Sequence, residues 1–243
     1  MREWQGKRYW LVGASEGLGA ALAHKLSRAG VHLILSARGA AGLEVLAEAL
    51  PGPAEIKPVD VSDHAALERA AEEIGEIDGV IHMAGVYWPF GAQDWDVEQA
   101  NTMARVNFGG AVALAGTVLP RFVRQDKGHV VLTGSLSGFR GLPASAPYSS
   151  SKAGVMVLAE SLYADLRKTG VEVQLLNPGF IKTRLTAKNT FKMPFLMEPE
   201  EAAQICFEHM TSGGFKRSFP FGFGLFFRIA QFLPDWLYYR LVS

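Results

Sequence analysis

The chain has little of several features that would each indicate a particular class of protein. It has one cysteine, Cys206, which excludes an intrachain disulfide framework and is typical of a reducing, cytoplasmic compartment. Lysine plus arginine and aspartate plus glutamate both number 24, so no net charge attracts nucleic acid. No uninterrupted apolar run reaches the roughly eighteen residues of a membrane-spanning helix, and the short polar N-terminus does not resemble a signal peptide.

The composition and the order of the apolar segments indicate one large α/β domain over residues 1–243. The chain is 49% apolar and 20% charged, as expected of a globular protein with a sizeable core. Apolar segments typical of buried strands alternate with helical patterns, which predicts a parallel sheet with helices on both faces. The expected strands are residues 9–12, 31–37, 55–59, 77–83, 128–133, 171–176 and, at an edge of the sheet, 215–221.

A glycine-rich turn follows the first expected strand. Gly13, Gly17 and Gly19 lie between that strand and an Ala/Leu-rich helix over residues 19–29. In such a turn, backbone N–H groups and the helix N-terminus bind a pyrophosphate. Glu16 adds negative charge close to that phosphate and counts against this interpretation. The alternative is a plain strand-to-helix turn without a ligand.

The tips of the second and third strands carry residues suited to the adenosine half of a dinucleotide. Arg38 follows the second strand, and no acidic residue stands beside it. A basic side chain at this place pairs with a 2′-phosphate, whereas an acidic one binds a 2′-hydroxyl, so Arg38 favours NADP(H) over NAD(H). The alternative for Arg38 is a solvated surface side chain. Asp60 either contacts the adenine amino group or belongs to a turn in which Ser62 or Asp63 caps the next helix.

Three residues further along the chain suit proton transfer. Tyr148 and Lys152 are four residues apart on an expected helix over residues 148–168, so they share one face of it. An ammonium beside the phenol lowers the tyrosine pKa from its usual value of about 10 toward the range of a general acid/base. Ser135, just past the carboxyl end of the fifth strand, is suited to hold a substrate oxygen while Tyr148 moves the proton.

Two other polar residues admit two interpretations each. His82 ends the fourth strand; it is either a catalytic group or, as we favour, a packed histidine that hydrogen-bonds to backbone. Asn107 falls inside a long helical pattern over residues 97–124. Because asparagine is a poor residue for a helix interior, Asn107 either bends the helix or is kept for a contact.

Aromatic and leucine side chains in the loops predict an apolar substrate pocket. We expect about half of the candidates in its walls and the rest in ordinary packing; they are Tyr87, Trp88, Phe90, Phe139, Leu142, Phe180 and Phe195. Residues 180–197 contain four lysines or arginines among scattered Phe and Leu, a pattern that we interpret as a mobile lid over the substrate.

Residues 222–243 form an aromatic C-terminal tail. Its apolar side chains share roughly one helix face, broken at Pro234; they are Leu225, Phe226, Ile229, Phe232, Leu233, Trp236, Leu237 and Leu241. Three interpretations remain open: the tail covers the substrate cleft or a subunit interface, lies in a membrane interface with Arg228 and Arg240 toward the head groups, or packs on its own domain. We expect it to be ordered against the protein and to help close the pocket.

In order and spacing, these motifs resemble those of the compact branch of the short-chain dehydrogenases/reductases. The matching motifs lie between residues 6 and 184 and are Gly13-x3-Gly17-x-Gly19, Asp60-Val61, Ala84-Gly85, Asn107, Ser135, Tyr148-x3-Lys152 and Asn177-Pro178-Gly179 with Thr183. Two motifs depart from the family, since Val12 replaces a usual threonine and His82-Met83 replaces two usual asparagines. The family also often ends in a glycine-rich strand that builds a tetramer face, where this chain has its aromatic tail.

The resemblance implies a Rossmann-type doubly wound fold, a nicotinamide cofactor and a small carbonyl or alcohol substrate. It implies that Tyr148 is the acid/base, that Ser135 orients the substrate oxygen, and that Asn107 holds a water of the proton relay. Lys152 would lower the tyrosine pKa and bind the nicotinamide ribose. The expected cofactor contacts are Gly13, Ser15, Glu16, Gly17, Leu18, Gly19, Arg38, Asp60, Val61, Ala84, Gly85, Tyr148, Lys152, Pro178, Gly179, Ile181 and Thr183, and no metal site is expected.

The leading hypothesis is a cytoplasmic, NADP(H)-dependent oxidoreductase that interconverts a carbonyl and a secondary alcohol on an apolar or aromatic substrate, with Tyr148 as acid/base. The alternative is a dinucleotide-binding redox sensor or regulatory protein without significant turnover. We expect no nucleic-acid partner. We expect a homodimer and leave a tetramer open, and peripheral membrane contact is one of the interpretations of the tail.

Overall fold

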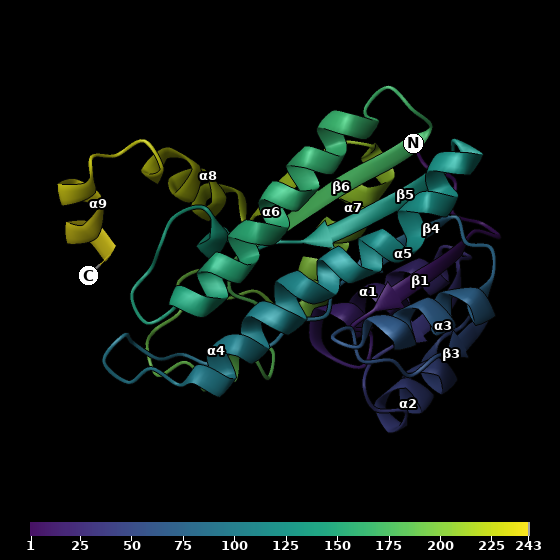
Figure 1. Ribbon diagram of the computed structural model, residues 1–243, viewed down its shortest axis with the longest axis horizontal. Coiled ribbons are helices and arrows are strands. Elements are labelled where there is room, and N and C mark those ends of the chain that lie inside the picture. Colours follow the sequence, from purple (N-terminus) through teal and green to yellow (C-terminus); the bar gives the residue numbers. More distant parts are fainter. Residues whose placement is uncertain (243) are drawn as a thin grey trace.

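Seven parallel strands form the centre of the molecule. In the computed structural model, which describes residues 1–242, they pair in the order β3-β2-β1-β4-β5-β6-β7 (Figure 1). The predicted α/β fold with about seven strands is confirmed, although the third strand is shorter and the sixth longer than expected. The strands are β1 Arg8–Val12, β2 His32–Ser36, β3 Ala54–Ile56, β4 Gly79–His82, β5 Gly128–Thr133, β6 Val171–Pro178 and β7 Lys216–Phe219.

Helices cover both faces of this sheet. One face carries α1 Gly17–Arg28, α2 Ala41–Ala49 and α7 Pro199–Ser212, and the other carries α3 His64–Ile74, α5 Gly110–Gln125 and α6 Ala146–Leu166. Along β1, Leu11 packs into the first layer, whereas Trp10 and Val12 pack into the second. Successive side chains of a strand point to opposite faces, and both faces here are covered. This double burial explains why the strands are nearly continuous apolar runs.

The long helix expected over residues 97–124 is interrupted around Asn107. It consists of α4 Val97–Met103, a π-helical segment Ala104–Gly109 and α5. Within residues 1–242, the stretch Val97–Gln125 is long and apolar enough to cross a membrane by length and composition. Its side chains Leu114, Val118 and Phe122 lie in the core against the sheet. We therefore assign this stretch to the protein core.

The carboxyl ends of the strands point toward the end of the molecule that carries the tail (Figure 1). Three irregular segments lie there. The first is the short 3₁₀ helix Leu136–Gly138 after β5. The second is the segment 180–197, which includes the 3₁₀ helix Thr186–Lys188 and is closed by a bridge between Ile181 and Met197. The third is the tail itself, with helices α8 Phe221–Ala230 and α9 Asp235–Val242.

Arg140 holds the tail against the body of the protein. Its Nη1 donates to the carbonyl oxygens of Ala230 at 2.8 Å and of Leu233 at 2.7 Å, and its Nη2 pairs with the carboxylate of Asp235. The guanidinium also lies 4.1 Å from the ring centroid of Tyr238, which is fully buried. The expectation that the tail is ordered against the protein agrees with these contacts. We call this group of contacts the Arg140 clasp.

Most side chains of the apolar helix face expected in the tail are exposed. The tail buries Phe227, Ala230 and Tyr238 instead. The tail thus packs on the body through residues other than those of its expected apolar face. Of the predicted face, the side chains that stay exposed are Leu225, Phe226, Ile229, Phe232, Trp236 and Leu241.

Candidate active site

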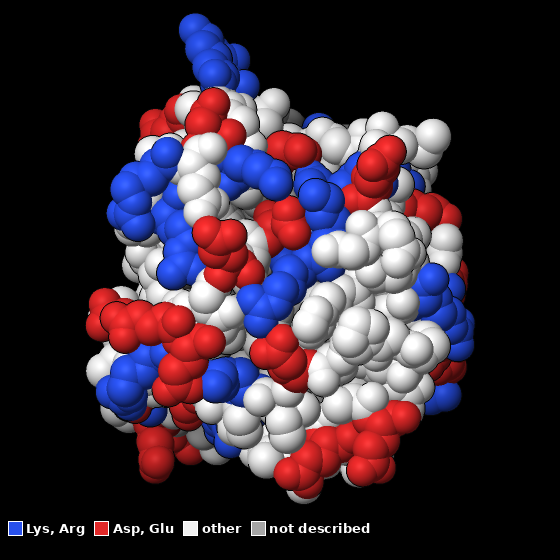
Figure 2. All heavy atoms as spheres, turned by 90° about the vertical axis from the view of Figure 1, so that its right-hand side faces the viewer, with Lys and Arg blue, Asp and Glu red and all other residues white. Residues whose placement is uncertain are grey.

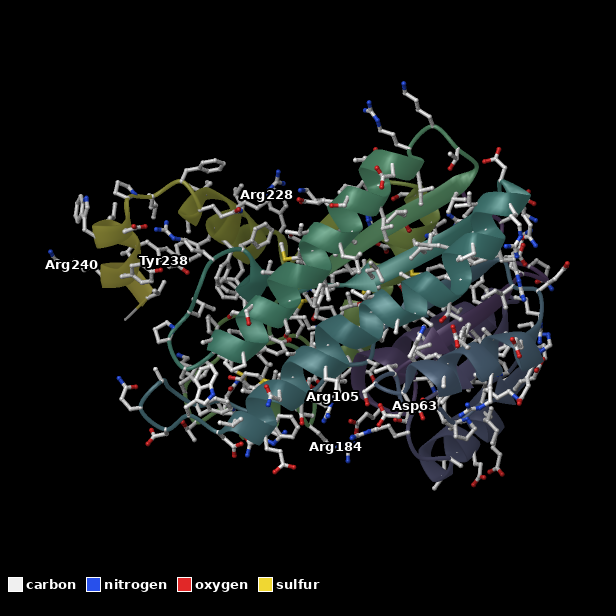
Figure 3. All side chains as sticks on the ribbon, in the orientation of Figure 1. Asp63, Arg105, Arg184, Arg228, Tyr238 and Arg240 are labelled. Atoms are coloured by element: carbon white, nitrogen blue, oxygen red, sulfur yellow. The ribbon has the colours of Figure 1, made fainter. Side chains whose placement is uncertain are left out.

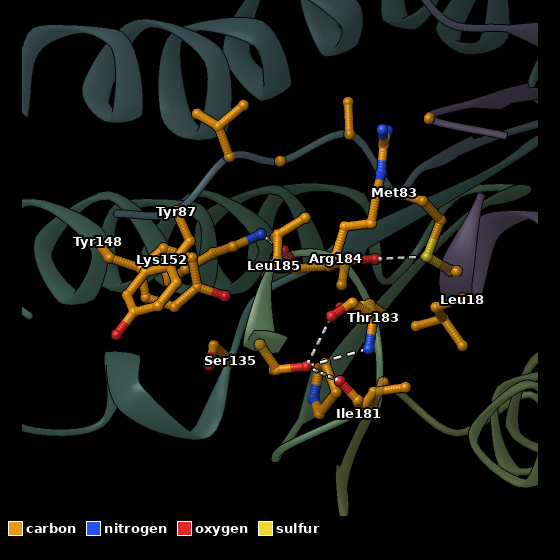
Figure 4. A pocket seen from close by; sticks show the side chains of 18 of the residues that line it. Leu18, Met83, Tyr87, Ser135, Tyr148, Lys152, Ile181, Thr183, Arg184 and Leu185 are labelled. Atoms are coloured by element: carbon orange, nitrogen blue, oxygen red, sulfur yellow. Dashed lines mark hydrogen bonds between the residues drawn. The ribbon is translucent and has the colours of Figure 1, made fainter. Parts of the chain in front are cut away.

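One cavity of about 1110 Å³ opens at the carboxyl ends of the strands. It brings together all of the expected catalytic and cofactor-binding residues except Asn107 (Figure 4). Drug-sized ligands occupy cavities of about 300 to 1000 Å³, so this one has room for a dinucleotide and a small substrate together. The predicted residues that line it are Gly13, Ser15, Glu16, Gly17, Leu18, Gly19, Arg38, Asp60, Val61, Ala84, Gly85, Ser135, Tyr148, Lys152, Pro178, Gly179, Ile181 and Thr183.

The glycine turn has the close packing that a pyrophosphate cradle needs. Gly13 and Gly17 have φ angles of +93° and +55°, a region that other residues rarely adopt. A Cβ on Gly13 would lie 2.4 Å from the backbone N of Ala84, and one on Gly19 would lie 2.0 Å from the carbonyl oxygen of Gly13. No side chain caps α1, so the N–H groups of its first turn remain available to an anion. This geometry fits a bound dinucleotide.

At the adenosine end of the cavity, Arg38 is exposed and has no hydrogen bond or ion pair with the rest of the described chain. Its neighbour Ser36 is committed elsewhere, since its Oγ accepts from Trp10 Nε1 at 2.8 Å and donates to the carbonyl of Lys57 at 2.6 Å. Arg38 is thus the cationic group at this end of the cavity that is free to meet a ligand phosphate.

Asp60 lies both at the cavity and in a turn before a capped helix, so the two interpretations given for it are compatible. Asp60 lines the cavity, and its Oδ1 accepts from the backbone N of Ser62 at 2.9 Å and from the Ser62 hydroxyl at 2.7 Å. Asp63 caps α3, because its Oδ1 accepts from the backbone N of Ala66 at 2.9 Å (Figure 3). Asp60 therefore remains free to contact a ligand in the cavity.

An ion pair crosses the mouth of the cavity between the glycine turn and the segment 180–197. Arg184, which is labelled in Figures 3 and 4, pairs with Glu16, and both residues line the cavity. The neighbouring carboxylate raises the pKa of Arg184. The negative charge of Glu16, which counted against phosphate binding in the sequence, is balanced in this way. Glu16 and Arg184 are 168 positions apart in the chain, and no sequence pattern predicted that they would pair.

Ser135 and Tyr148 meet in the cavity as predicted. Ser135 is buried at the end of β5, and Tyr148, in the first turn of α6, is half-buried. A hydrogen bond from the Ser135 side chain lowers the pKa of the Tyr148 phenol, but burial outweighs it and raises that pKa to about 12. The Ser137 hydroxyl in turn donates to Ser135 Oγ at 3.0 Å, which fixes the serine side chain.

Lys152 lies beside this pair, and a carbonyl group of β5 holds its ammonium. Its Nζ donates to the carbonyl oxygen of Thr133 at 2.9 Å and lies 5.9 Å from the ring centroid of Tyr148. Burial lowers the pKa of Lys152 to about 8. Desolvation is the largest influence on the phenol in this geometry, so the lowering of the tyrosine pKa by Lys152 stays a prediction.

Asn107 lies behind the cavity and holds its wall. Its Oδ1 accepts from the backbone N of Val86 at 2.7 Å, and its Nδ2 donates to the carbonyl of Val86 at 3.0 Å and to Ser151 Oγ at 3.0 Å. The contact predicted for this asparagine is present, and the π-helical segment surrounds it. Both N–H groups are used, so a relay water could only donate to the remaining lone pair of Oδ1.

His82 is packed in β4 and does not line the cavity. It is fully buried, in agreement with the favoured interpretation, but the expected hydrogen bond to backbone is absent: neither ring nitrogen has a partner within residues 1–242. Burial lowers the pKa of His82 to about 3, and the positive charge of Lys152 adds to the effect. The ring is therefore neutral at physiological pH.

The substrate end of the cavity is largely aromatic. Three of the seven predicted wall residues line it, namely Tyr87, Leu142 and Phe180. The other four lie elsewhere: Trp88 lies under Lys188, Phe90 packs on Trp95, Phe139 packs in the core, and Phe195 is exposed.

Several wall residues were not expected from the sequence, above all Phe223 and Phe227 of the tail. They are four residues apart in α8, and that spacing was the signal available for them. The Tyr87 ring stands edge-on to Tyr148 at 4.9 Å, and its hydroxyl donates to Asn189 Oδ1 at 2.9 Å. The segment 180–197 thus reaches across to the loop after β4.

A dinucleotide cradle and a Ser–Tyr–Lys cluster in one cavity of a doubly wound sheet define a nucleotide-dependent oxidoreductase. The family model of the short chain dehydrogenases matches residues 7–193. The chain belongs to this family. The family supports an enzyme that acts on CH–OH or C=O groups with a nicotinamide dinucleotide.

Relatives and solved structures agree with this assignment. An uncharacterized oxidoreductase from Myxococcus xanthus is 38% identical over 98% of this chain and 97% of its own length. A short-chain dehydrogenase from Sphingobium yanoikuyae, solved in complex with NADPH, is 27% identical with a TM-score of 0.83 over 88% of each chain. A short chain dehydrogenase/reductase from Burkholderia phymatum, solved in complex with NAD, has a TM-score of 0.86 over 95% of this chain and 94% of its own. At 22% identity it shows the fold alone.

Proposed function

We propose that this protein is an NADP(H)-dependent oxidoreductase that interconverts a carbonyl and a secondary alcohol on an apolar or aromatic substrate, with Tyr148 as the acid/base. The observation that carries the proposal is the meeting of Tyr148 and Ser135, with Lys152 beside them, in the cavity that also contains the glycine cradle. The residues suited to proton transfer and the residues suited to dinucleotide binding therefore line the same cavity.

The side chains divide the work at the reacting carbon. A nicotinamide dinucleotide in the cavity would supply a hydride to the carbonyl carbon, or accept one in the reverse direction. Ser135 donates a hydrogen bond to the substrate oxygen and holds it beside Tyr148. Tyr148 gives its proton to that oxygen in reduction and takes it back in oxidation. A pKa of about 12 keeps the phenol protonated at neutral pH, which suits the reductive direction.

Lys152 contributes the positive charge of the site. Its ammonium, held by the carbonyl of Thr133, stabilises the negative charge that remains on Tyr148 after the proton has left. Because its pKa is about 8, Lys152 is mostly protonated at pH 7 and loses its charge in mildly alkaline solution. This dependence gives the proposed mechanism a measurable upper pH limit.

Preference for NADP(H) is supported by Arg38. The guanidinium is exposed, lines the adenosine end of the cavity and has no other partner among the described residues. A free guanidinium binds a 2′-phosphate through charge-assisted hydrogen bonds. The related Sphingobium enzyme was solved with NADPH, which is consistent with this preference.

The wall of the cavity supports an apolar or aromatic substrate. Phe180, Phe223 and Tyr87 come from three separate segments and surround the end of the cavity next to Tyr148. Aromatic walls bind apolar groups by removing them from water.

An activity screen with matched tyrosine variants tests the proposal. Carbonyl compounds would be screened with NADPH, with loss of nicotinamide absorbance as the readout. Tyr148→Phe should lower kcat by roughly 10² or more without loss of cofactor binding. Tyr163→Phe is the matched control and should have normal kinetics. Tyr163 lies in the same helix but outside the cavity, and its ring stacks on that of Phe215 with 4.1 Å between the ring centroids.

The two hypotheses for the family member give opposite results in this screen. Cofactor binding without turnover of any carbonyl or alcohol would favour a redox-sensing regulatory protein. Retention of more than about half the activity in Tyr148→Phe would refute the acid/base assignment, since such a group contributes about 10² or more. A homodimer and a cytoplasmic location remain predictions, which sedimentation and localisation of the tagged protein would test.

A further inference from the structure

The tail presents a set of large apolar side chains to the outside of the molecule. α8 and α9 stand at one end of the protein, beyond the carboxyl ends of the strands (Figure 1). Phe232 and Trp236 are 88% and 71% exposed. We call this set the tail surface; it consists of Phe221, Leu225, Phe226, Ile229, Phe232 and Trp236. Exposure of so many large apolar side chains together is unusual for the surface of a monomer and marks an interaction site.

The tail surface is held in place by contacts on its inner side. The Arg140 clasp binds the carbonyl oxygens of Ala230 and Leu233, and Tyr238 donates to the carbonyl of Gly141 at 2.9 Å. Phe227 is buried on the inner side of α8. The outward direction of the apolar side chains is therefore built into the fold rather than caused by a loose end.

Basic side chains outnumber acidic ones in the segments around the tail surface. Residues 180–197 contact the tail, with the ring of Phe195 5.4 Å from that of Phe223, and Phe191, Phe195 and Leu196 are exposed there as well. Residues 180–197 and 221–242 together hold six of the 24 basic residues of the chain and one of its 24 acidic residues. That acidic residue, Asp235, is already paired with Arg140.

Only some of these six basic residues are neutralised by ion pairs. Lys182 and Arg184 are paired with Glu198 and Glu16, whereas Arg228 and Arg240 form no ion pair with any residue from 1 to 242 (Figure 3). The face at the other end of the molecule mixes acidic and basic side chains (Figure 2). A chain without net charge is therefore positive around its exposed apolar side chains.

We propose that the tail surface docks on an anionic lipid membrane. Short helices that carry Phe, Trp and Leu on one side, with arginines beside them, lie in the boundary between lipid head groups and acyl chains. The aromatic side chains leave water there, and the long stems of Arg228 and Arg240 let their guanidinium groups reach the phosphates.

The charge distribution disfavours a second copy of the chain as the occupant of this surface. A twofold contact places the same patch on both partners. It would therefore place Arg228 and Arg240 of both copies in one contact, with no unpaired acidic side chain in the described tail to balance them. An anionic bilayer supplies the missing charge.

Docking on a membrane also indicates a substrate class for the proposed oxidoreductase, and this inference rests on the proposed function. Phe223 and Phe227 line the cavity from the inner side of α8, while Leu225 and Phe226 face outward from the same helix. One helix thus separates the membrane from the substrate end of the cavity. The substrate class is then a lipid-soluble carbonyl or alcohol that passes from the bilayer into the cavity.

Vesicle binding by the full-length protein tests the docking. The protein would be sedimented with vesicles of phosphatidylcholine that contain phosphatidylglycerol, and with vesicles of phosphatidylcholine alone. We expect binding to the anionic vesicles, weaker binding to the neutral ones, and loss of the difference as salt approaches about 1 M, where screening acts within about 3 Å. The double variant Phe232→Ser/Trp236→Ser should bind at least about tenfold more weakly, since each side chain loses its transfer out of water.

A second variant tests the charge, and a third serves as control. Arg228→Gln/Arg240→Gln should weaken binding to anionic vesicles by roughly 25-fold, at about fivefold for each arginine, and leave binding to neutral vesicles unchanged. The control is Val45→Ser/Val157→Ser, in which the removed side chains are 70% and 61% exposed but lie in α2 and α6. It should bind as the unchanged protein does.

Three outcomes would overturn the proposal. The first is absence of binding to anionic vesicles, and the second is equal loss of binding in the control. The third is a protein dimer that dissociates in Phe232→Ser/Trp236→Ser without any vesicle binding, which would assign the tail surface to a second copy. Equal melting temperatures of all variants would show that each one is folded.

The same proteins separate failure of the docking from failure of the proposed function. Reduction of a water-soluble ketone with NADPH should be unchanged in the tail-surface variants, because none of these residues lines the cavity. Reduction of a long-chain ketone held in anionic vesicles should fall with vesicle binding. Turnover of the soluble ketone without vesicle binding refutes only the docking, whereas vesicle binding without turnover refutes only the enzyme assignment.

Discussion

Replacing His82 with leucine should stabilise the protein, and should do so more strongly in acid. His82 is fully buried, and neither of its ring nitrogens has a partner among residues 1–242. A buried polar group without a hydrogen bond costs about 1–3 kcal/mol, and leucine fills a similar volume without that cost. At pH 7 we therefore expect His82→Leu to raise the free energy of unfolding by about 1 kcal/mol.

The acid dependence follows from the pKa of this histidine. Burial lowers that pKa from 6.5 to about 3 in the folded protein, so between these values the unfolded state binds the proton and the folded state does not. Stability is therefore lost as the pH falls below 6.5. At about pH 5, roughly 1.5 units below the unfolded pKa, the loss from His82 is about 2 kcal/mol. His82→Leu should then be about 3 kcal/mol more stable than the unchanged protein.

Urea unfolding at a series of pH values between 7 and 5 measures this difference. Comparison with the unchanged protein at each pH removes the contribution of His129, whose pKa burial also lowers to about 3. His64→Leu is the control, since that ring lies on the surface of α3 and its replacement removes no buried imidazole. Parallel curves for His82→Leu and the unchanged protein between pH 7 and 5 would refute the reasoning.

Three further predictions concern the cavity and the tail. Arg38→Asp should reverse a preference for NADPH over NADH, because a charge-assisted pair contributes about 1.5–3 kcal/mol and repulsion adds to its loss; equal dissociation constants for the two cofactors in the unchanged protein would contradict it. The kcat/KM for reduction should fall above about pH 8 as Lys152 loses its proton, and Lys152→Arg should remove this fall because arginine stays charged; the same fall in Lys152→Ala would exclude Lys152 as its cause. Arg140→Met should lower the free energy of unfolding by about 1–3 kcal/mol and raise KM for a bulky apolar substrate. Truncation after Gly222 should have the same two effects. The control Arg124→Met, on the exposed end of α5, should change neither quantity. Normal stability and KM in Arg140→Met would show that the clasp does not hold the pocket wall.

Much of the fold and of the cavity could be predicted because local patterns carry them. Apolar runs buried on both faces are typical of parallel strands, and β5 begins and ends at the expected residues. The glycine turn is recognisable because Gly13 and Gly19 lie where any side chain would collide with backbone. Tyr148 and Lys152 meet because one helix turn joins them. Each of these features depends on residues close together in the chain.

What could not be predicted depends on contacts between distant segments. Arg140 donates to carbonyl groups that are 90 and 93 residues further along the chain, so no local pattern shows which face of the tail packs on the protein. Arg184 and Glu16 meet only because β1 and β6 end at the same edge of the sheet. Burial is the largest influence on the pKa of Tyr148, and burial at a cavity wall is set by the whole fold.

The Arg140 clasp also has a consequence for how the molecule opens. Local unfolding proceeds in contiguous units, and the units with few buried contacts open first. One guanidinium holds the end of α8, the start of α9 and the ring of Tyr238, so release of that group frees both helices in a single step. The backbone amides of α8 and α9 should therefore exchange their hydrogens together, and earlier than those of β5. Because Phe223 and Phe227 leave with α8, each such excursion also opens one wall of the cavity, and the exchange rate of the tail becomes a measure of how often the pocket is open to its surroundings.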